Sequence, residues 1–241
     1  MPIEAIPDHV AIAVPSIDRA ARRWRDELGG GWIGAAMDME DGGFATRQLR
    51  YPGSGGRSTG ARLELLEPRS ERSFAAAFIR RFGARVHHVT LKVAELLPAV
   101  EQLEREGYDV VDVSVANESW HEAFLRPSQV GGMIVQVAWA PNTSEEYAVE
   151  LGAPLEDPAQ DAAVLHGPTL THPDLPTSRA VWTALGAEVV DREGGLDVAW
   201  PGSQLTVRVV PGAPPTSLGL RVSGRRPLED DPELGPATLT D

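Results

Sequence analysis

Four polar side chains stand inside otherwise apolar, strand-like segments of this chain. His9 and His88 each begin an alternating apolar segment, and Glu64 and Gln136 each interrupt a later apolar run. A carboxylate or an amide within a core strand is costly unless another group pairs with it. Two imidazoles, one carboxylate and one amide offer two nitrogen and two oxygen donors, a set that suits a first-row divalent metal ion.

The spacing of these residues reveals an internal repeat. His88 follows His9 by 79 residues, and each histidine begins a predicted strand that leads into a predicted helix. Three strand-like segments follow each helix, at residues 31–37, 43–51 and 61–66 in the first copy and at 108–113, 120–126 and 133–139 in the second. Each copy therefore predicts a βαβββ module. Its first strand carries the histidine and its last strand carries the carboxylate or amide.

A third, weaker copy follows the first two. A strand near residues 168–173 and a helix at 176–185 precede three short strand-like segments, and Gly167 stands 79 residues after His88. The position that corresponds to Glu64 is Val207 or Arg208, so we expect this copy to bind no metal and to be either a structural module or a dimer contact. Residues 217–222 are either the first strand of an uncompleted fourth copy or a closing edge strand.

These observations predict an α+β protein with a division into four parts. Residues 1–141 are predicted to contain two tandem βαβββ modules. Residues 142–159 are predicted to be a linker, residues 160–224 a third module without metal ligands, and residues 225–241 a loose tail.

Composition excludes several classes of site and partner. The chain has 241 residues and no cysteine, which excludes disulfides, thiolate metal sites and cysteine nucleophiles. Its net charge of −13 argues against nucleic acids and anionic membranes as partners. No apolar run approaches the roughly 20 residues that span a bilayer, and no signal peptide is recognised at the N-terminus. We therefore expect a cytoplasmic protein that binds a small molecule.

A structural interpretation of the same polar residues competes with the metal site. A single histidine in a strand is more often a hydrogen-bonded structural residue than a ligand, and Glu64 has Arg62 and Arg85 as possible ion-pair partners. The placement of four polar residues at equivalent positions of two copies favours the metal site. The pattern alone leaves both interpretations open.

The motifs that carry these residues resemble the vicinal oxygen chelate superfamily, which contains glyoxalases, epimerases, extradiol dioxygenases and bleomycin-resistance proteins. The matching segments are DHVAIAV at 8–14, LELLEP at 63–68, HHVTLKV at 87–93 and GMIVQ at 132–136. The resemblance implies that the paired modules form a curved mixed sheet around a metal cavity, which encloses one divalent ion, Zn, Ni, Co, Mn or Fe. It also implies that the ligands are His9, Glu64, His88 and Gln136.

Among the branches of this superfamily, the motifs around His9 and Glu64 look most like methylmalonyl-CoA epimerase. That resemblance implies proton abstraction beside a carbonyl or thioester. Two positions depart from it, because Gln136 stands where glutamate is usual and Arg47 aligns with the catalytic glutamate. Glu122 lies five residues before Pro127, as Arg47 lies five before Pro52, so we take Glu122 as the candidate general base.

The resemblance leaves three functions to compare. The first is a metal-dependent lyase or isomerase of the glyoxalase or epimerase type, as a monomer or a homodimer. The second is an extradiol-type iron dioxygenase, which uses two histidines and one carboxylate. The third is a metal-free protein that binds a small molecule, as bleomycin-resistance proteins do.

Overall fold

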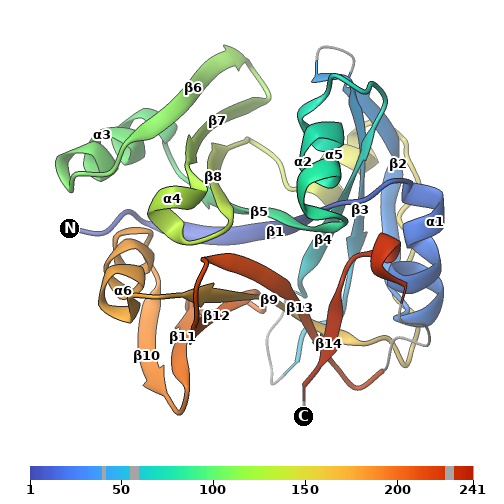
Figure 1. The fold of residues 1–241 in the computed structure, drawn as a ribbon. Coiled ribbons are helices and arrows are strands. Elements are labelled where there is room, and N and C mark those ends of the chain that lie inside the picture. The colour runs from blue at the N-terminus through green and yellow to red at the C-terminus, as the bar shows by residue number, and fades with distance from the viewer. Residues whose placement is uncertain (40–41, 55–59, 226–230, 241) are drawn as a thin grey trace.

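The computed structural model describes residues 1–39, 42–54, 60–225 and 231–240, which form two β-sheets with helices around them (Figure 1). The first sheet has eight strands in the order β2-β3-β4-β1-β5-β8-β7-β6. The second has six strands in the order β10-β11-β12-β9-β13-β14. Neither sheet closes on itself, so the predicted α+β class is confirmed with open rather than barrel-like sheets.

The first sheet is built from two βαβββ modules. The first module consists of β1 (Ala5–Ala13), α1 (Ile17–Ala21) with its π-helical continuation η1 (Arg22–Glu27), β2 (Gly31–Met39), β3 (Phe44–Arg50) and β4 (Arg62–Pro68). After the connecting helix α2 (Phe74–Phe82), the second consists of β5 (Arg85–Val93), α3 (Leu96–Arg105), β6 (Val110–Asn117), β7 (Trp120–Leu125), α4 (Pro127–Val130) and β8 (Ile134–Trp139).

The second sheet contains the predicted third module and two further strands. Its elements are β9 (Val164–His172), α6 (Leu175–Ala184), β10 (Glu188–Arg192), β11 (Gly195–Ala199), β12 (Thr206–Pro211), β13 (Thr216–Ser223), the 3-10 turn η3 (Pro232–Leu234) and β14 (Ala237–Leu239). Helix α5 (Ser144–Glu150) lies in the predicted linker, and Leu155 forms a β-bridge with Ile33 of the first sheet. The predicted domain boundaries stay predictions.

Short polar residues begin the helices, as the sequence pattern indicates. The Ser73 hydroxyl accepts a hydrogen bond from the Ala76 amide at α2, and Asp174 accepts one from the Thr177 amide at α6. At α5, Thr143 and Glu146 form a reciprocal capping box. Because these side chains bond the first unpaired amides of each helix, they determine where the chain turns away from the sheets.

The second sheet repeats the strand order of the first. In both sheets the first strand of a module pairs in parallel with its last strand, β1 with β4 and β9 with β12. It also pairs antiparallel with the next module's first strand, β5 or β13. Strand β14 runs parallel to β13, as β8 runs parallel to β5. Residues 217–222 therefore lie in the first strand of an incomplete fourth module, which has no counterparts of β6 and β7 in the described residues.

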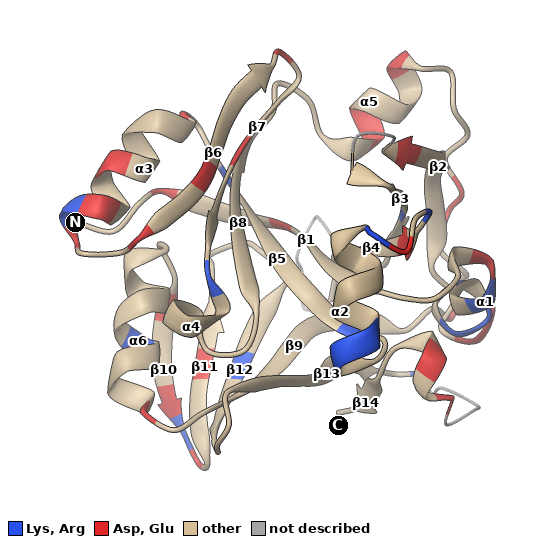
Figure 2. Cartoon of the chain, turned by 45° about the horizontal axis from the view of Figure 1, so that its top comes forward, with Lys and Arg blue, Asp and Glu red and all other residues tan. Residues whose placement is uncertain are grey.

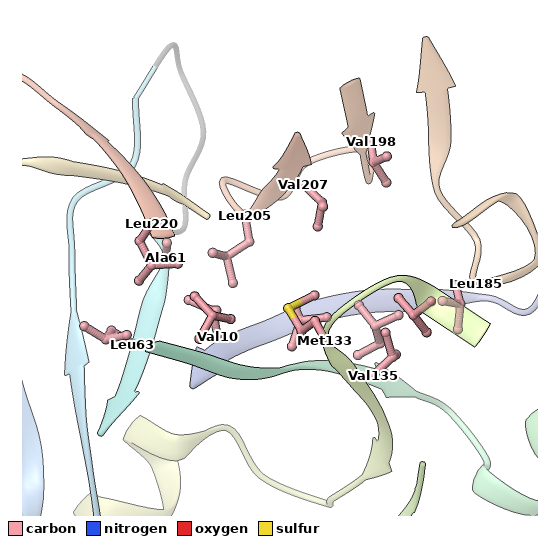
Figure 3. Packing of buried hydrophobic residues seen from close by; sticks show 14 of the residues in the cluster. Val10, Ala61, Leu63, Met133, Val135, Leu185, Val198, Leu205, Val207 and Leu220 are labelled. Atoms are coloured by element: carbon pink, nitrogen blue, oxygen red, sulfur yellow. The ribbon is translucent and has the colours of Figure 1, made fainter. Parts of the chain in front are cut away.

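A continuous hydrophobic core joins the two sheets. Figure 3 shows residues of the first sheet facing residues of the third module. From the first side come Val10, Ala61, Leu63, Met133 and Val135; from the other come Leu185, Val198, Leu205, Val207 and Leu220. These positions alternate with the polar ones, such as His9 and Glu64 in the first sheet, because successive side chains of a strand point to opposite faces. The faces that carry polar residues therefore point away from this shared core.

The prediction of a loose tail is wrong for the described residues 231–240. Leu234 is fully buried, its carbonyl accepts a hydrogen bond from Trp24 Nε1 at 2.7 Å, and the Gly235 carbonyl accepts one from Arg23. Arg19 forms an ion pair with Asp231 at 2.9 Å. Although this segment is rich in proline and acidic residues, these contacts attach it to α1 and η1.

Substitution of Leu234 with alanine should lower the free energy of unfolding by about 2–5 kcal/mol, because it leaves a cavity beside Trp24. Chemical denaturation would measure the change. Leu97, which is 50 % exposed on α3, provides the matched control, and Leu97→Ala should cost far less. Equal effects of the two substitutions would show that the C-terminal segment contributes nothing to the core.

Candidate metal centre

The antiparallel pairing of β1 with β5 brings the two predicted histidine ligands together. In this register His9 lies opposite Thr90, and Ala11 lies opposite His88. The two pairs share one face of the sheet, and the imidazole centroids of His9 and His88 are 5.7 Å apart. Both histidines are buried. Two residues that are 79 positions apart in the sequence are thus neighbours in the fold.

Glu64 completes a three-residue cluster on that face. Strand β4 runs beside β1, and the Glu64 carboxylate oxygen Oε2 lies 3.4 Å from His9 Nε2 and 3.7 Å from His88 Nε2. One ligand atom from each residue falls within 4.8 Å of the others. Among the described residues this is the one group of histidine and acidic side chains with such a geometry. The three residues could therefore hold a metal ion.

Gln136 joins the cluster through a threonine. The hydroxyl of Thr90 donates a hydrogen bond to Gln136 Oε1 at 2.6 Å and lies 3.0 Å from His9 Nε2. Strand β8 pairs in parallel with β5 and places Gln136 beside Thr90. The structure thus brings all four predicted ligands to one face, where the Thr90 hydroxyl links the amide oxygen of Gln136 to Nε2 of His9.

An ion-pair network orients His9. Asp8 Oδ2 lies 2.8 Å from His9 Nδ1, which leaves Nε2 facing Glu64. The other Asp8 oxygen pairs with Arg62 at 2.9 Å and Lys92 at 3.5 Å. A carboxylate on the far nitrogen of a metal-binding histidine determines its tautomer and ring orientation. Arg62 therefore pairs with Asp8 and Glu145 rather than with Glu64, for which the structural interpretation offered Arg62 or Arg85 as a partner.

A β-bulge precedes each ligand histidine. The register skips Asp8 between Pro7 and His9, and it skips His87 in β5. The His87 ring is buried against Phe74 and Phe78, and its Nδ1 lies 2.9 Å from His88 Nδ1. Each extra residue therefore contacts the ring of the histidine that follows it. Bulges commonly redirect side chains beside functional sites in this way.

The electrostatics of the cluster suit a metal ion. Burial raises the pKa of Glu64, but the charge and hydrogen bond of His9, together with His88 and the Thr46 hydroxyl, outweigh burial and lower the pKa to about 2. Burial by itself would lower the pKa of His9. The carboxylates of Glu64 and Asp8 together outweigh burial and raise the pKa to about 9. Burial, with nearby His87, holds the pKa of His88 well below its usual value. At neutral pH, Glu64 is thus ionised and His88 neutral, which are the states in which these groups bind metals, whereas His9 carries a proton that metal binding must displace.

A buried polar atom beside the cluster is consistent with a bound ligand. Gln48 lies opposite Glu64 in the β3–β4 register and therefore on the same face. Its Oε1 atom is buried and has no hydrogen-bond partner in the described part of the chain. Such an atom is costly unless a ligand or water satisfies it. Together with the donor set, it shows that the residues present fit a divalent ion and its remaining ligands.

Glu122 lies at the edge of this cluster. Its Oε2 atom accepts hydrogen bonds from Gln136 Nε2 at 2.7 Å and from Trp120 Nε1 at 2.9 Å. The residue is half-buried on β7, on the face that carries Gln136. The structure thus places the candidate base in contact with one candidate ligand.

The predicted equivalence of Arg47 and Glu122 is wrong. The pairing of Gln48 with Glu64 corresponds to the pairing of Phe124 with Gln136, so the counterpart of Glu122 is Thr46. The Thr46 hydroxyl donates to Glu64 Oε1 at 2.6 Å, as Gln136 donates to Glu122. Arg47 lies on the opposite face and stacks on Trp32. Counting from the prolines erred by one residue, which in a strand exchanges the two faces.

Several residues of the site were not identified from the sequence. Thr90 follows His88 by two positions, so the alternation of side chains along a strand could have placed it on the same face. Gln48 follows Thr46 by two positions and shares its face for the same reason. Asp8 carried no such signal, because its contact with His9 depends on a bulge that only the paired strands reveal.

The fold and the site define a class of protein: open sheets of βαβββ modules that carry a metal-competent cluster across the junction of two modules. The sequence profile of the glyoxalase/bleomycin resistance protein/dioxygenase superfamily matches residues 8–124. A curated relative, the ethylmalonyl-CoA/methylmalonyl-CoA epimerase of Cereibacter sphaeroides, is 31% identical over 134 residues, which are 54% of this chain and 94% of that protein. The chain belongs to the glyoxalase/bleomycin resistance protein/dioxygenase superfamily.

Further comparisons agree with this assignment. Human mitochondrial methylmalonyl-CoA epimerase is 26% identical over 136 residues, which are 55% of this chain and 73% of that protein. A hypothetical protein from Staphylococcus aureus shares the fold over 92% of both chains, with a TM-score of 0.65 and 10% identity. One from Bacillus halodurans, at 24% identity, matches 58% of this chain and 96% of its own, with a TM-score of 0.51. The curated relatives thus match about half of this chain, whereas the fold match with the Staphylococcus aureus protein covers 92% of it.

No described helix is both long and apolar enough to cross a membrane.

Removal of a cluster histidine should abolish tight metal binding. We expect His88→Ala to weaken Co²⁺ or Zn²⁺ binding more than about 100-fold, and Asp8→Asn, which removes only the partner of His9, to weaken it roughly 10–100-fold. Isothermal titration calorimetry of the metal-stripped protein measures both effects. The matched control is His121→Ala, since His121 stacks on Trp139 and takes no part in the cluster. Equal affinities of His88→Ala and His121→Ala would contradict the assignment.

Proposed function

We propose that this protein is a metal-dependent isomerase that removes a proton from the carbon beside a carbonyl, with a coenzyme A thioester as the substrate class. The observation that carries the proposal is the contact between Glu122 and Gln136 at the edge of the His9–Glu64–His88 cluster. It sets a carboxylate beside the place where a substrate carbonyl would meet a cation. The epimerase relatives support the substrate class.

In this proposal four side chains hold the ion, namely His9, Glu64, His88 and Gln136. When bound, a divalent cation supplies positive charge that stabilises the negative charge developing on the substrate carbonyl oxygen. Asp8 keeps Nε2 of His9 directed at the cluster, and Thr90 orients the amide of Gln136 so that its oxygen faces the same point. At the metal position, the residues Asp8 and Thr90 therefore serve to orient the side chains that would bind the ion.

Glu122 is the proposed general base. Its two hydrogen bonds, from Gln136 and Trp120, both end on Oε2. Within the described residues Oε1 is therefore the oxygen that is free to take the substrate proton. Trp120 and Gln136 hold the carboxylate in a single orientation, which a proton transfer requires.

Replacement of Glu122 with glutamine should stop proton removal without loss of the metal. In D₂O, exchange of the α-proton of methylmalonyl-CoA, followed by NMR, should slow by at least about 100-fold, the usual contribution of a general base. Glu118→Gln, on the exposed β6–β7 turn, is the matched control and should exchange at the wild-type rate. Unchanged exchange in Glu122→Gln would remove Glu122 from the mechanism, and absence of exchange in the wild-type protein would refute the proposed reaction.

An extradiol-type iron dioxygenase is the second candidate, because two histidines and one carboxylate are the ligands of that class. Gln136 argues against it, because an amide ligand there would occupy a coordination position that oxygen chemistry needs open. Oxygen uptake by the iron-loaded protein with a catechol would support this candidate, and no uptake would exclude it. A metal-free binding function predicts instead that the purified, reconstituted protein retains no metal. The expected homodimer and cytoplasmic location stay predictions.

A further inference from the structure

The second sheet has a counterpart of the metal centre, and its residues follow from the strand registers. Ala11 pairs with Glu64 in the first sheet as Thr169 pairs with Arg208 in the second. His9 lies opposite Thr90 as Gly167 lies opposite Arg221. Taken in the order His9, Glu64, His88 and Gln136, the equivalent residues are Gly167, Arg208, Gly219 and Thr238. No histidine and no carboxylate occupies any of these four positions.

Two arginines occupy this place in the second sheet. Arg208 stands at the position of Glu64, and Arg221 stands at the position of Thr90, the residue that links His9 to Gln136 in the first sheet. Both guanidinium groups are half-buried. The side chains at these equivalent positions therefore suit a cation in the first sheet and repel a cation in the second.

The positive charge on this face is only partly compensated. Asp197 pairs with Arg208 at 2.9 Å and with Arg192 at 3.2 Å. Arg221 forms no ion pair with any described residue. Figure 2 shows the basic segment on β12, within a chain whose net charge is −13. One carboxylate thus faces three guanidinium groups, in a protein that is otherwise strongly acidic.

Arg221 has donors to spare. Its Nη2 donates to the Thr206 hydroxyl at 2.7 Å and to the Thr206 carbonyl at 3.1 Å. Its Nε is buried and has no hydrogen-bond partner among the described residues. Burial lowers the pKa of Arg221 to about 10, although the Asp197 carboxylate raises it; the positive charge of Arg208 lowers it slightly further. A buried guanidinium with an unpaired donor is unfavourable unless an acceptor of opposite charge satisfies it.

We propose that the face of the second sheet around Arg208 and Arg221 binds an oxyanion, the carboxylate or phosphate group of a small molecule. A guanidinium presents its donors in a planar fork that matches two oxygens of either group. The Thr206 hydroxyl lies against the same guanidinium and adds a further polar group beside it. The site takes the place of the metal centre within its own sheet and does not depend on the proposed isomerase activity.

The test is a titration of the full-length protein with inorganic phosphate and, separately, with acetate, at constant ionic strength maintained with chloride. We expect saturable binding of at least one of the two anions, and the tighter one identifies the group that the site prefers. Arg221→Gln should weaken that binding by roughly tenfold or more, because a charge-assisted hydrogen bond is lost. Arg105→Gln, an equal change of charge on exposed α3, should leave it unchanged.

A second measurement needs no variant. The Nε–H resonance of Arg221 in the wild-type protein should shift as the anion is added and should saturate at the same concentration. Failure of both anions to saturate would overturn the proposal, as would equal binding by wild type and a folded Arg221→Gln, or a stationary Arg221 resonance. Metal affinity should be the same in wild type and Arg221→Gln, since the metal cluster lies on the other sheet.

Discussion

The antiparallel pairing of β1 with β5 is the constraint on which the candidate site depends. It sets His9 opposite Thr90 and Ala11 opposite His88, so residues of two modules face one another across a local pseudo-twofold axis. The parallel neighbours β4 and β8 then bring Glu64 and Gln136 to the same face. A one-residue slip in this register would move the ligands to the opposite face. The bulges at Asp8 and His87 supply a contact for each histidine ring. Between the two bulges, His9 stays paired with Thr90 and Ala11 with His88.

The buried polar groups of the cluster are stable because each has a partner of opposite charge or a hydrogen bond. Glu64 receives the Thr46 hydroxyl and the charge of His9, and Asp8 receives Arg62 and Lys92. Desolvation opposes ionisation of Asp8, His9 and Glu64, and their mutual attraction reverses that effect because they lie close together. The same contacts that make burial tolerable also orient the ligands.

The two sheets show how one backbone arrangement can serve opposite chemistry. Strand order, pairing direction and bulges recur in the second sheet, where His166 and Leu218 are the residues that the register skips. His166 thus corresponds to Asp8, and Leu218 corresponds to His87. The side chains at equivalent positions are His9 and Glu64 in one sheet and Gly167 and Arg208 in the other. Function in this fold therefore follows the residues placed at a few positions, not the sheet that carries them.

The sequence by itself determined the repeat, the strand alternation and the four ligand types, since periodicity in hydrophobicity reports which face of a strand is buried. It led to His9, Glu64, His88, Gln136 and Glu122. Tertiary structure alone decided that Thr46, not Arg47, corresponds to Glu122, and that Asp8 supports His9, because both depend on register and bulges. It also decided that Leu234 is buried and that its carbonyl accepts a hydrogen bond from Trp24. Contacts between distant segments depend on pairing energies that the local pattern does not record.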